Sequence, residues 1–475
     1  MKICFILEGS YPYVRGGVST WVDGYIRSMP QHQFILWTIT DLESKQGKFV
    51  YELPKNVVEV HEKCLGSSFN LRINKNPNLK FSEEEKEAIY QLIKCGEPDW
   101  RVILNSFNLQ SNKPVELFLS EEFLKILKKC AREEFPFAGY KDLFWTIRSM
   151  FLPLLYLIGQ PMPEADLYHS PSTGYAGVLA ALGSMKYNKT FVLTEHGIYT
   201  REREEEILRA DWVISYFKDF WISMFFMFAR LAYKQAHRVT SLYQRASLIQ
   251  QDLGCPPEKC VVVRNGLDFE SFSAIPEKSR DGWVDVAAIV RFAPIKDLKT
   301  LIYTFSRLKR EFEKVRLHII GGIDDEEYHQ ECLELIDYLK VEDIIMPGTV
   351  KTTTYLEKID FTILTSLSEG QPFALLESMA ARRPVIATDV GCCRELIEGA
   401  ADDEFGPAGI CVPPMHQSKL LQALIEMCQN EGNRKTMGEA GQKRIKNFYE
   451  IKNVINTYLK VYEKAIATWQ ESGLN

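Results

Sequence analysis

Short apolar runs alternate with amphipathic stretches along most of the first half of the chain. The runs that read as strands are KICFILEG, FILWTIT, VVEVHE, ADLYHS, FVLTEH, RVTSLY and CVVVRNG. Stretches with helical spacing separate many of them, and GGVSTWVDGYIRSM is the first. A continuous apolar run is typical of a strand that helices cover on both faces. The pattern therefore predicts an α/β domain built on a parallel sheet.

A second series of apolar runs begins near residue 283. Its predicted strands are VDVAAIVRF, VRLHIIGG, IIMPG, DFTILTS, PVIATDV and GICVPP. Two such series indicate two doubly wound domains. The polar stretch ESFSAIPEKSRDG contains Pro and Gly and is typical of a linker, so we place the domains at 1–275 and 276–450.

Residues near 75–160 break this alternation. They contain the acidic run SEEEKE and helical patterns such as LFWTIRSMFLPLLYLI. We interpret them as a helical insertion into the first domain, and we find no functional motif in it.

Two apolar segments raise the question of membranes. The N-terminal run is only five residues long and ends at Glu8, so it predicts a buried first strand rather than a signal peptide. The run FWISMFFMFA at 220–229 has ten residues, too few to span a bilayer. It is either a core helix or, within 213–233, a surface that touches a membrane or a membrane-bound partner.

Charge and cysteine content narrow the class of protein. The net charge is −6 and no basic tract is present, which disfavours nucleic acid as a partner. The 11 cysteines form no CxxC pair and show no spacing typical of metal ligands. Their scatter through apolar segments predicts reduced thiols in a cytoplasmic protein without a metal site.

Candidate chemistry follows the predicted strands, because ligands of open parallel sheets bind at the carboxyl ends of the strands. Gly16 and Gly17 follow the first strand at a helix start, where free backbone N–H groups suit a phosphate, although a tight turn is the alternative. His196 follows FVLTE and is either a ligand contact or a structural histidine. Arg291 and Lys296 follow VDVAAIV in one loop and suit a diphosphate, unless they are solvated surface charges.

Two glutamates, Glu369 and Glu377, lie in the stretch SEGQPFALLE after the apolar run DFTILTS. Pro372 between them fits the first turn of a helix, and Glu377 then lies about 1.4 turns further on. A pair of acid–base carboxylates, as in a glycoside hydrolase, is disfavoured because one glutamate is in a loop and the other in a helix. The glutamates instead suit two hydroxyl-rich rings on either side of a phosphate. That ligand is a nucleotide sugar.

At these residues the chain resembles retaining glycosyltransferases of family 4, most strongly over 283–415. EGQPFALLESMAARRPVIATDVG is similar to the glutamate-x7-glutamate block of that family, and VRNGLD to its Asn-Gly-x-Asp element. IVRFAPIKD is similar to its Arg…Lys phosphate loop, GGVS to its N-terminal glycine loop, and TEHG to the place of its donor-site histidine. The stretch PIKDLKT, the run REREEE and the long insertion look like the PelF subgroup of exopolysaccharide glycosyltransferases.

The resemblance implies a GT-B fold, in which two Rossmann-like doubly wound domains face each other across a cleft. The first domain would bind the acceptor and contain the insertion, and the second would bind the nucleotide sugar. A C-terminal helix at 451–475 would cross back to the first domain.

The resemblance also implies roles for the candidate residues. Arg291 and Lys296 would bind the diphosphate, Glu377 the ribose, and His196 and Glu369 the transferred sugar, while Gly17 would lie against the phosphates and acceptor. The implied catalytic residues are His196, Arg291, Lys296 and Glu369. The implied donor-binding residues are Gly16, Gly17, Arg291, Lys296, Glu369, Gly370, Gln371, Pro372, Phe373 and Glu377.

The expected function is transfer of a hexose, with retention, from UDP-glucose or a related UDP-hexose to a carbohydrate acceptor in Pel-type exopolysaccharide synthesis. No DxD-type pair follows a strand in a suitable context, so we expect no metal and no cofactor besides the donor. The expected location is the cytoplasm, at the periphery of the inner membrane, where 213–233 would contact a synthesis complex.

Four residues depart from the family pattern. Val290 and Asp297 replace glycines of the phosphate loop. Gln371 and Pro372 replace the usual aromatic residue and glycine, and Pro372 supplies no N–H to the sugar. Two alternatives remain open, namely a non-catalytic scaffold that binds a nucleotide sugar and a related GT-B enzyme such as a sugar-nucleotide epimerase.

Overall fold

The computed structural model describes residues 1–41, 43–69, 79–110, 113–400 and 403–472. The chain divides into two compact units, one of residues 1–262 and 458–475 and one of residues 263–457. The boundary that the sequence places at 275/276 therefore falls inside the second unit. There the short helix α11 (Phe269–Ser273) packs against helices of that unit.

The first unit is built on a seven-stranded parallel sheet with the order β3-β2-β1-β4-β5-β6-β7. Its strands are β1 (Lys2–Glu8), β2 (Gln33–Thr40), β3 (Val57–Cys64), β4 (Leu167–Ser170), β5 (Thr190–Glu195), β6 (Arg238–Ser241) and β7 (Cys260–Val262). Its helices are α1 (Gly17–Arg27), α2 (Glu83–Ile93), α3 (Trp100–Phe107), α4 (Lys113–Leu119), α5 (Glu121–Glu133), α6 (Tyr140–Ile158), α7 (Tyr175–Tyr187), α8 (Tyr199–Arg209), α9 (Lys218–Gln235) and α10 (Gln244–Asp252).

The second unit is built on a six-stranded parallel sheet with the order β10-β9-β8-β11-β12-β13. Its strands are β8 (Val284–Ile289), β9 (Val315–Ile320), β10 (Ile344–Gly348), β11 (Phe361–Leu364), β12 (Val385–Thr388) and β13 (Gly409–Val412). Its remaining helices are α12 (Leu298–Leu308), α13 (Glu326–Leu339), α14 (Thr352–Tyr355), α15 (Phe373–Ala380), α16 (Cys393–Glu398), α17 (Gln417–Gln429) and α18 (Glu431–Phe448). The last helix, α19 (Ile451–Ser472), begins in this unit and ends in the first.

Both sheets are doubly wound, as the alternating pattern predicted. In the second unit the chain leaves β8 for β9 and β10 and then returns to β11, which pairs with the other side of β8. The strand order therefore reverses between β8 and β11, and in the first unit it reverses in the same way between β1 and β4. Such a reversal separates the loops at the carboxyl edge and opens a crevice there, which is where ligands of this fold class bind.

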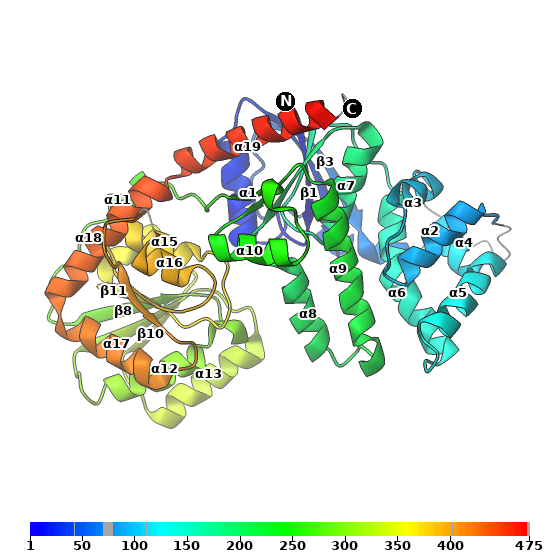
Figure 1. Cartoon of the computed structure of the whole chain (residues 1–475). Coiled ribbons are helices and arrows are strands. Elements are labelled where there is room, and N and C mark those ends of the chain that lie inside the picture. The colour runs from blue at the N-terminus through cyan, green and yellow to red at the C-terminus, as the bar shows by residue number, and fades with distance from the viewer. Residues whose placement is uncertain (42, 70–78, 111–112, 401–402, 473–475) are drawn as a thin grey trace. The chain divides into compact units, whose positions relative to one another are not determined.

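Helices α2 to α6 lie between β3 and β4 in the chain and to one side of the first sheet (Figure 1). The acidic run SEEEKE begins α2 with a capping box. The Ser82 hydroxyl accepts from the Glu85 N–H at 3.1 Å, and the Ser82 N–H donates to Glu85 Oε2 at 2.8 Å. These bonds satisfy two backbone N–H groups at the helix start, those of Ser82 and Glu85. The neighbouring acidic residues interact favourably with the positive end of the helix dipole.

The apolar run 220–229 lies in α9, which packs against α7 and α8. Phe220, Met224 and Phe228 are buried with at most 5% of their surface exposed. The core interpretation therefore holds for most of this run. In the segment before α9, by contrast, Trp212 is 69% exposed and Tyr216 is 55% exposed.

Candidate functional site

Lys296 and Glu369 meet at the reversal point of the second sheet. Lys296 ends a short 3-10 turn, Pro294–Lys296, after β8, and Glu369 lies in the loop after β11. Lys296 Nζ lies 2.6 Å from Glu369 Oε1, with only 17% and 11% of the two side chains exposed. The structure thus joins a cation and a carboxylate that are 73 residues apart in the chain.

Hydrogen bonds to backbone carbonyls hold these two loops together. The Thr365 hydroxyl donates to the Lys296 carbonyl at 3.0 Å, and the Leu367 N–H donates to the Ile295 carbonyl at 2.8 Å. Gly391 has a φ of 55°, and a Cβ there would lie 2.1 Å from the Glu369 carbonyl oxygen. Because only glycine fits so close an approach, the loop after β12 supports the backbone of Glu369.

Arg291 lies in the same loop as Lys296 but has a different partner. Its guanidinium is half exposed and pairs with Asp324, which follows β9. An exposed ion pair of this kind contributes little stability, so the guanidinium can exchange Asp324 for an anionic ligand at small cost.

Pro372 stands at the N-cap of α15, one residue before the first helical residue, Phe373. The sequence analysis predicted that Pro372 lies inside the first turn of the helix. Pro372 instead precedes the helix, because its backbone is extended, with a ψ of 119°. Among the described residues no side chain caps this helix start, so its first N–H groups can receive an anion.

Gln371 beside this helix start has a structural partner. Its side chain is 6% exposed, and its Oε1 accepts from the Asn265 N–H at 2.5 Å. The Gly370 carbonyl accepts from the Cys392 N–H at 3.1 Å. The side chain of Gln371 therefore holds the VRNGLD segment at the start of α15.

Glu377 lies further along α15 in a very different environment from Glu369. Burial raises the pKa of the Glu377 carboxyl to about 7, and a hydrogen bond with Thr352 only partly offsets this effect. The two glutamates of the SEGQPFALLE stretch therefore differ in kind, one bound to a lysine and one exchanging its proton near neutral pH.

In the first unit, Gly16 is the N-cap of α1 and Gly17 is its first residue. Gly16 has a φ of 175°, which any residue can adopt, and a Cβ on either glycine would meet nothing within 4 Å. Neither backbone conformation nor packing among the described residues therefore requires glycine at these positions. They leave open space over the helix start.

His196 follows β5 and packs edge-on against Trp21, with ring centroids 4.6 Å apart. Its Nε2 is buried and has no hydrogen-bond partner among the described residues. Burial lowers the pKa of the His196 imidazole to about 3, so the ring is neutral at physiological pH. A neutral ring with an unused nitrogen can make one hydrogen bond to a ligand.

Two carboxyls of the first unit escaped the sequence analysis. Burial raises the pKa of the Glu195 carboxyl to about 7, and Glu195 Oε2 accepts from Tyr233 Oη at 2.7 Å and from Gln250 Nε2 at 2.9 Å. Glu8 Oε1 accepts from Tyr199 Oη at 3.0 Å. Glu8 and Glu195 are the last residues of β1 and β5, and His196 directly follows Glu195. Their position at the ends of apolar runs could have identified them as candidate site residues.

Within the described ranges, no group of three or more His, Cys, Asp or Glu side chains is arranged to hold a metal ion. In the same part of the chain, no helix is both long enough and apolar enough to cross a bilayer.

Residues 1–258 match the family model described as a domain of unknown function, DUF3492. The chain belongs to this family. Residues 284–430 match a second model, glycosyl transferases group 1, so the second unit of this DUF3492 protein contains a group 1 glycosyltransferase domain. The expected glycosyltransferase family is confirmed at this level, and the PelF subgroup stays a prediction.

Curated relatives are similar over part of their length. The chain is 25% identical over 283 residues to the MMP alpha-(1->4)-mannosyltransferase of Mycolicibacterium hassiacum, covering 58% of this chain and 66% of the relative. It is 30% identical over 189 residues to the putative colanic acid biosynthesis glycosyltransferase WcaL of Escherichia coli, covering 38% and 44%. The DUF3492 protein thus spans less than two thirds of these relatives.

Solved structures share the fold along the whole chain. Anabaena Alr3699/HepE in complex with UDP and glucose gives a TM-score of 0.61 at 14% identity, covering 98% of this chain and 99% of that one. Sucrose-phosphate synthase from Thermosynechococcus elongatus gives a TM-score of 0.63 at 13% identity, with coverage of 98% and 99%. Identities this low indicate the fold alone, which is GT-B with two Rossmann-like domains, as expected.

Proposed function

We propose that this protein is a retaining glycosyltransferase that moves a hexose from a UDP-hexose, with UDP-glucose favoured, to a carbohydrate acceptor. The observation that carries the proposal is the contact between Lys296 and Glu369 at the reversal point, next to the uncapped start of α15. A cation and a helix N-terminus stabilise a departing diphosphate, and a carboxylate beside them accepts hydrogen bonds from sugar hydroxyls.

The donor-binding roles follow from these contacts. Lys296 holds the diphosphate while Arg291 exchanges Asp324 for phosphate oxygens. Glu369 then accepts from the hydroxyls of the transferred sugar, with backbone N–H groups at 370–373 beside it. Glu377, once ionised, accepts from the ribose hydroxyls.

In the transfer step, the bond between the anomeric carbon and the diphosphate oxygen breaks, and the acceptor oxygen bonds to that carbon. The proton of the acceptor hydroxyl is released with UDP, and no residue of the chain forms a covalent bond. The positive groups around the leaving diphosphate supply the stabilisation, so the proposed reaction needs no metal. The proposed contacts of Gly16, Gly17 and His196 with the donor rest on the resemblance. They are supported by the open space beside the two glycines and by the His196 Nε2, which has no partner among the described residues.

The proposed pathway is exopolysaccharide synthesis of the Pel type. The support is the PelF resemblance, together with relatives named for colanic acid and amylovoran biosynthesis. The proposed location is the cytoplasm at the inner membrane.

We further propose that an aromatic surface of the first unit contacts that membrane or a partner in it. Its residues lie around the starts of α6 and α9 and are exposed: Phe137, Tyr140, Trp145, Leu208, Trp212, Ile214 and Tyr216. Tyr216 Oη donates to Asp142 Oδ2 at 3.4 Å, which joins the two segments. This surface replaces most of the 213–233 region as the candidate, because α9 itself is largely buried.

The test of the function begins with calorimetry of UDP and UDP-glucose binding, followed by product analysis. Lys296→Ala should weaken UDP binding by roughly ten- to hundredfold, the effect of losing a charged hydrogen bond. Lys299→Ala is the matched control, because Lys299 follows in the next turn and pairs with exposed Glu331 instead. Equal affinities for the two variants would contradict the role of Lys296.

Nuclear magnetic resonance of the glycoside formed should show the same anomeric configuration as the donor. Inversion would overturn the retaining mechanism. Tight UDP binding without transfer or hydrolysis would favour the non-catalytic scaffold.

A further inference from the structure

A pocket of about 530 Å³ lies in the second unit at the edge of the sheet opposite Lys296 and Glu369. It adjoins the starts of β8, β11 and β12, whereas the candidate donor loops follow the ends of β8 and β11. Its basic lining residues are Lys278, Arg280, Arg382, Arg383, Arg434 and Lys435. Four acidic residues also line it, Glu277, Asp360, Glu431 and Glu439, so the lining carries a net charge of +2 in a chain whose net charge is −6.

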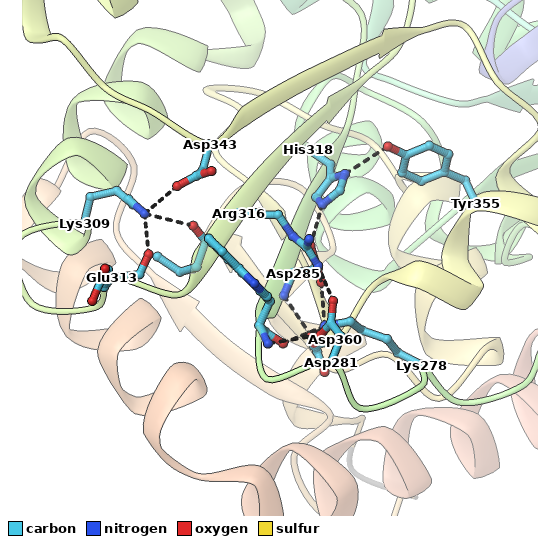
Figure 2. Close-up of polar contacts among 12 residues, drawn as sticks. Lys278, Asp281, Asp285, Lys309, Glu313, Arg316, His318, Asp343, Tyr355 and Asp360 are labelled. Atoms are coloured by element: carbon cyan, nitrogen blue, oxygen red, sulfur yellow. Dashed lines mark hydrogen bonds and ion pairs between the residues drawn. The ribbon is translucent and has the colours of Figure 1, made fainter.

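Three of these cations build the walls of the pocket. Lys278 Nζ bonds Asp285 Oδ2 at 2.5 Å and Asp360 Oδ2 at 2.9 Å, in the network that Figure 2 shows. Arg383 is 3% exposed and donates to three backbone carbonyls, and Arg434 donates to two carbonyls at the end of α17. These contacts within the protein account for a basic residue at each of Lys278, Arg383 and Arg434, so none of the three needs a ligand.

Arg382 has no such explanation. Its φ is 59°, in the left-handed region that a residue with a Cβ adopts only at a conformational cost. Its Nε is buried and has no hydrogen-bond partner among the described residues. The one ion pair that it forms within the described part of the chain, from Nη1 to Glu277 Oε1, is long at 3.6 Å and partly exposed, so this pair contributes little stability. Glycine would suit this backbone better, so the described contacts do not account for a guanidinium at this position.

Lys435 lines the same pocket from α18. It is exposed and forms no ion pair or hydrogen bond among the described residues. Arg382 and Lys435 are therefore two cations of one pocket whose charges the described contacts leave largely uncompensated.

We propose that this pocket binds a small molecule that carries phosphate, with Arg382 and Lys435 as its main contacts. The planar guanidinium of arginine matches two phosphate oxygens, and a lysine adds a point charge. Because the pocket and the donor loops lie at opposite edges of one sheet, this ligand is separate from the nucleotide-sugar donor.

The test is calorimetry with inorganic phosphate on the full chain in saturating UDP, which occupies the proposed donor site at the other edge. Arg382→Gly should weaken phosphate binding by about tenfold or more, the effect of losing one charged contact. Lys299→Ala removes a lysine that pairs with Glu331 outside both sites, and it should leave phosphate binding unchanged. An equal loss of affinity in Lys299→Ala, or no phosphate binding by the wild-type protein, would overturn the proposal.

Urea unfolding distinguishes lost contact from lost structure. Arg382→Gly should unfold at the same or a higher urea concentration than the wild type, because glycine adopts a φ of 59° without strain. If Arg382→Gly is nevertheless less stable than the wild type, Lys435→Glu replaces it in the binding test. This substitution at the exposed rim should also weaken phosphate binding by about tenfold or more. Unchanged binding in both variants would refute the site.

Discussion

At the scale of single residues, the environment separates Glu369 from Glu377 although one short motif contains both. Glu369 pairs with Lys296 at 2.6 Å, whereas burial raises the pKa of the Glu377 carboxyl to about 7. The sequence disfavours an acid–base pair for a local reason, because one glutamate lies in a loop and the other in a helix, and that interpretation stays a prediction. The pairing with Lys296 and the raised pKa depend on packing from distant parts of the chain, which no local pattern records.

The raised pKa of Glu377 predicts a specific pH dependence of stability. The folded protein keeps this proton up to about pH 7, while the unfolded chain releases it near its ordinary value of 4.5, so this carboxyl lowers stability as pH rises between the two. Glu377→Gln removes the effect. The stability of the variant relative to the wild type should increase by about 1–3 kcal/mol from about pH 4 to about pH 8.

Urea unfolding of both proteins across this pH range measures the difference. Glu311→Gln, at an exposed position of the same unit, is the control and should follow the wild type. A constant difference between Glu377→Gln and wild type would contradict the raised pKa. Under the proposed function the same variant binds UDP more weakly above pH 7, because the ribose loses an ionised acceptor.

At the scale of elements, α19 shows how a single helix completes the core of the first unit. Tyr458 and Tyr462 are fully buried, and Tyr462 Oη lies 2.7 Å from His169 Nδ1 in the middle of β4. His169 Nε2 lies 2.8 Å from the Thr194 hydroxyl on β5. The apolar spacing of the C-terminal segment predicts a helix, but which sheet face it covers depends on these partners from β4 and β5.

Tyr462→Phe tests this docking contact. It leaves one buried nitrogen of His169 without a partner, so the free energy of unfolding should fall by about 1–3 kcal/mol. Tyr338→Phe is the matched control, because Tyr338 is 82% exposed and its hydroxyl remains in water. Chemical denaturation of both variants gives the comparison, and an equal effect of the two would show that the Tyr462 hydroxyl contributes nothing.

At the scale of the whole molecule, the aromatic surface of the first unit stands out from the other exposed apolar side chains. Trp212 is 69% exposed, Phe137 is fully exposed, and the Trp212 ring lies 5.3 Å from that of Trp221. Exposed aromatic side chains grouped in this way are typical of an interaction surface. Trp and Tyr in particular prefer the interface between a membrane and water.

A double substitution, Trp212→Ser with Tyr216→Ser, should weaken co-sedimentation with phosphatidylethanolamine–phosphatidylglycerol vesicles by roughly tenfold or more, since each ring buries apolar area at the interface. Tyr338→Ser removes an even more exposed ring from the other unit and should have no effect. If the wild-type protein does not sediment with vesicles, direct membrane contact is refuted and the surface is left to a protein partner.

The sequence by itself determined the two parallel sheets, the helical segment between β3 and β4, and the loops that contain the candidate residues. Apolar runs and helical spacing are local consequences of burial, so they can be read from a single chain. The tertiary structure alone decided which of these loops meet. Because β11 pairs with the free side of β8, Lys296 lies against Glu369, and because β9 pairs with the other side of β8, Arg291 contacts Asp324. Gln371, in the loop after β11, binds Asn265 from the segment after β7. Strand order is set by packing of the whole sheet, and the same packing buries Glu377 and Arg382 Nε in surroundings that no spacing of residues could predict.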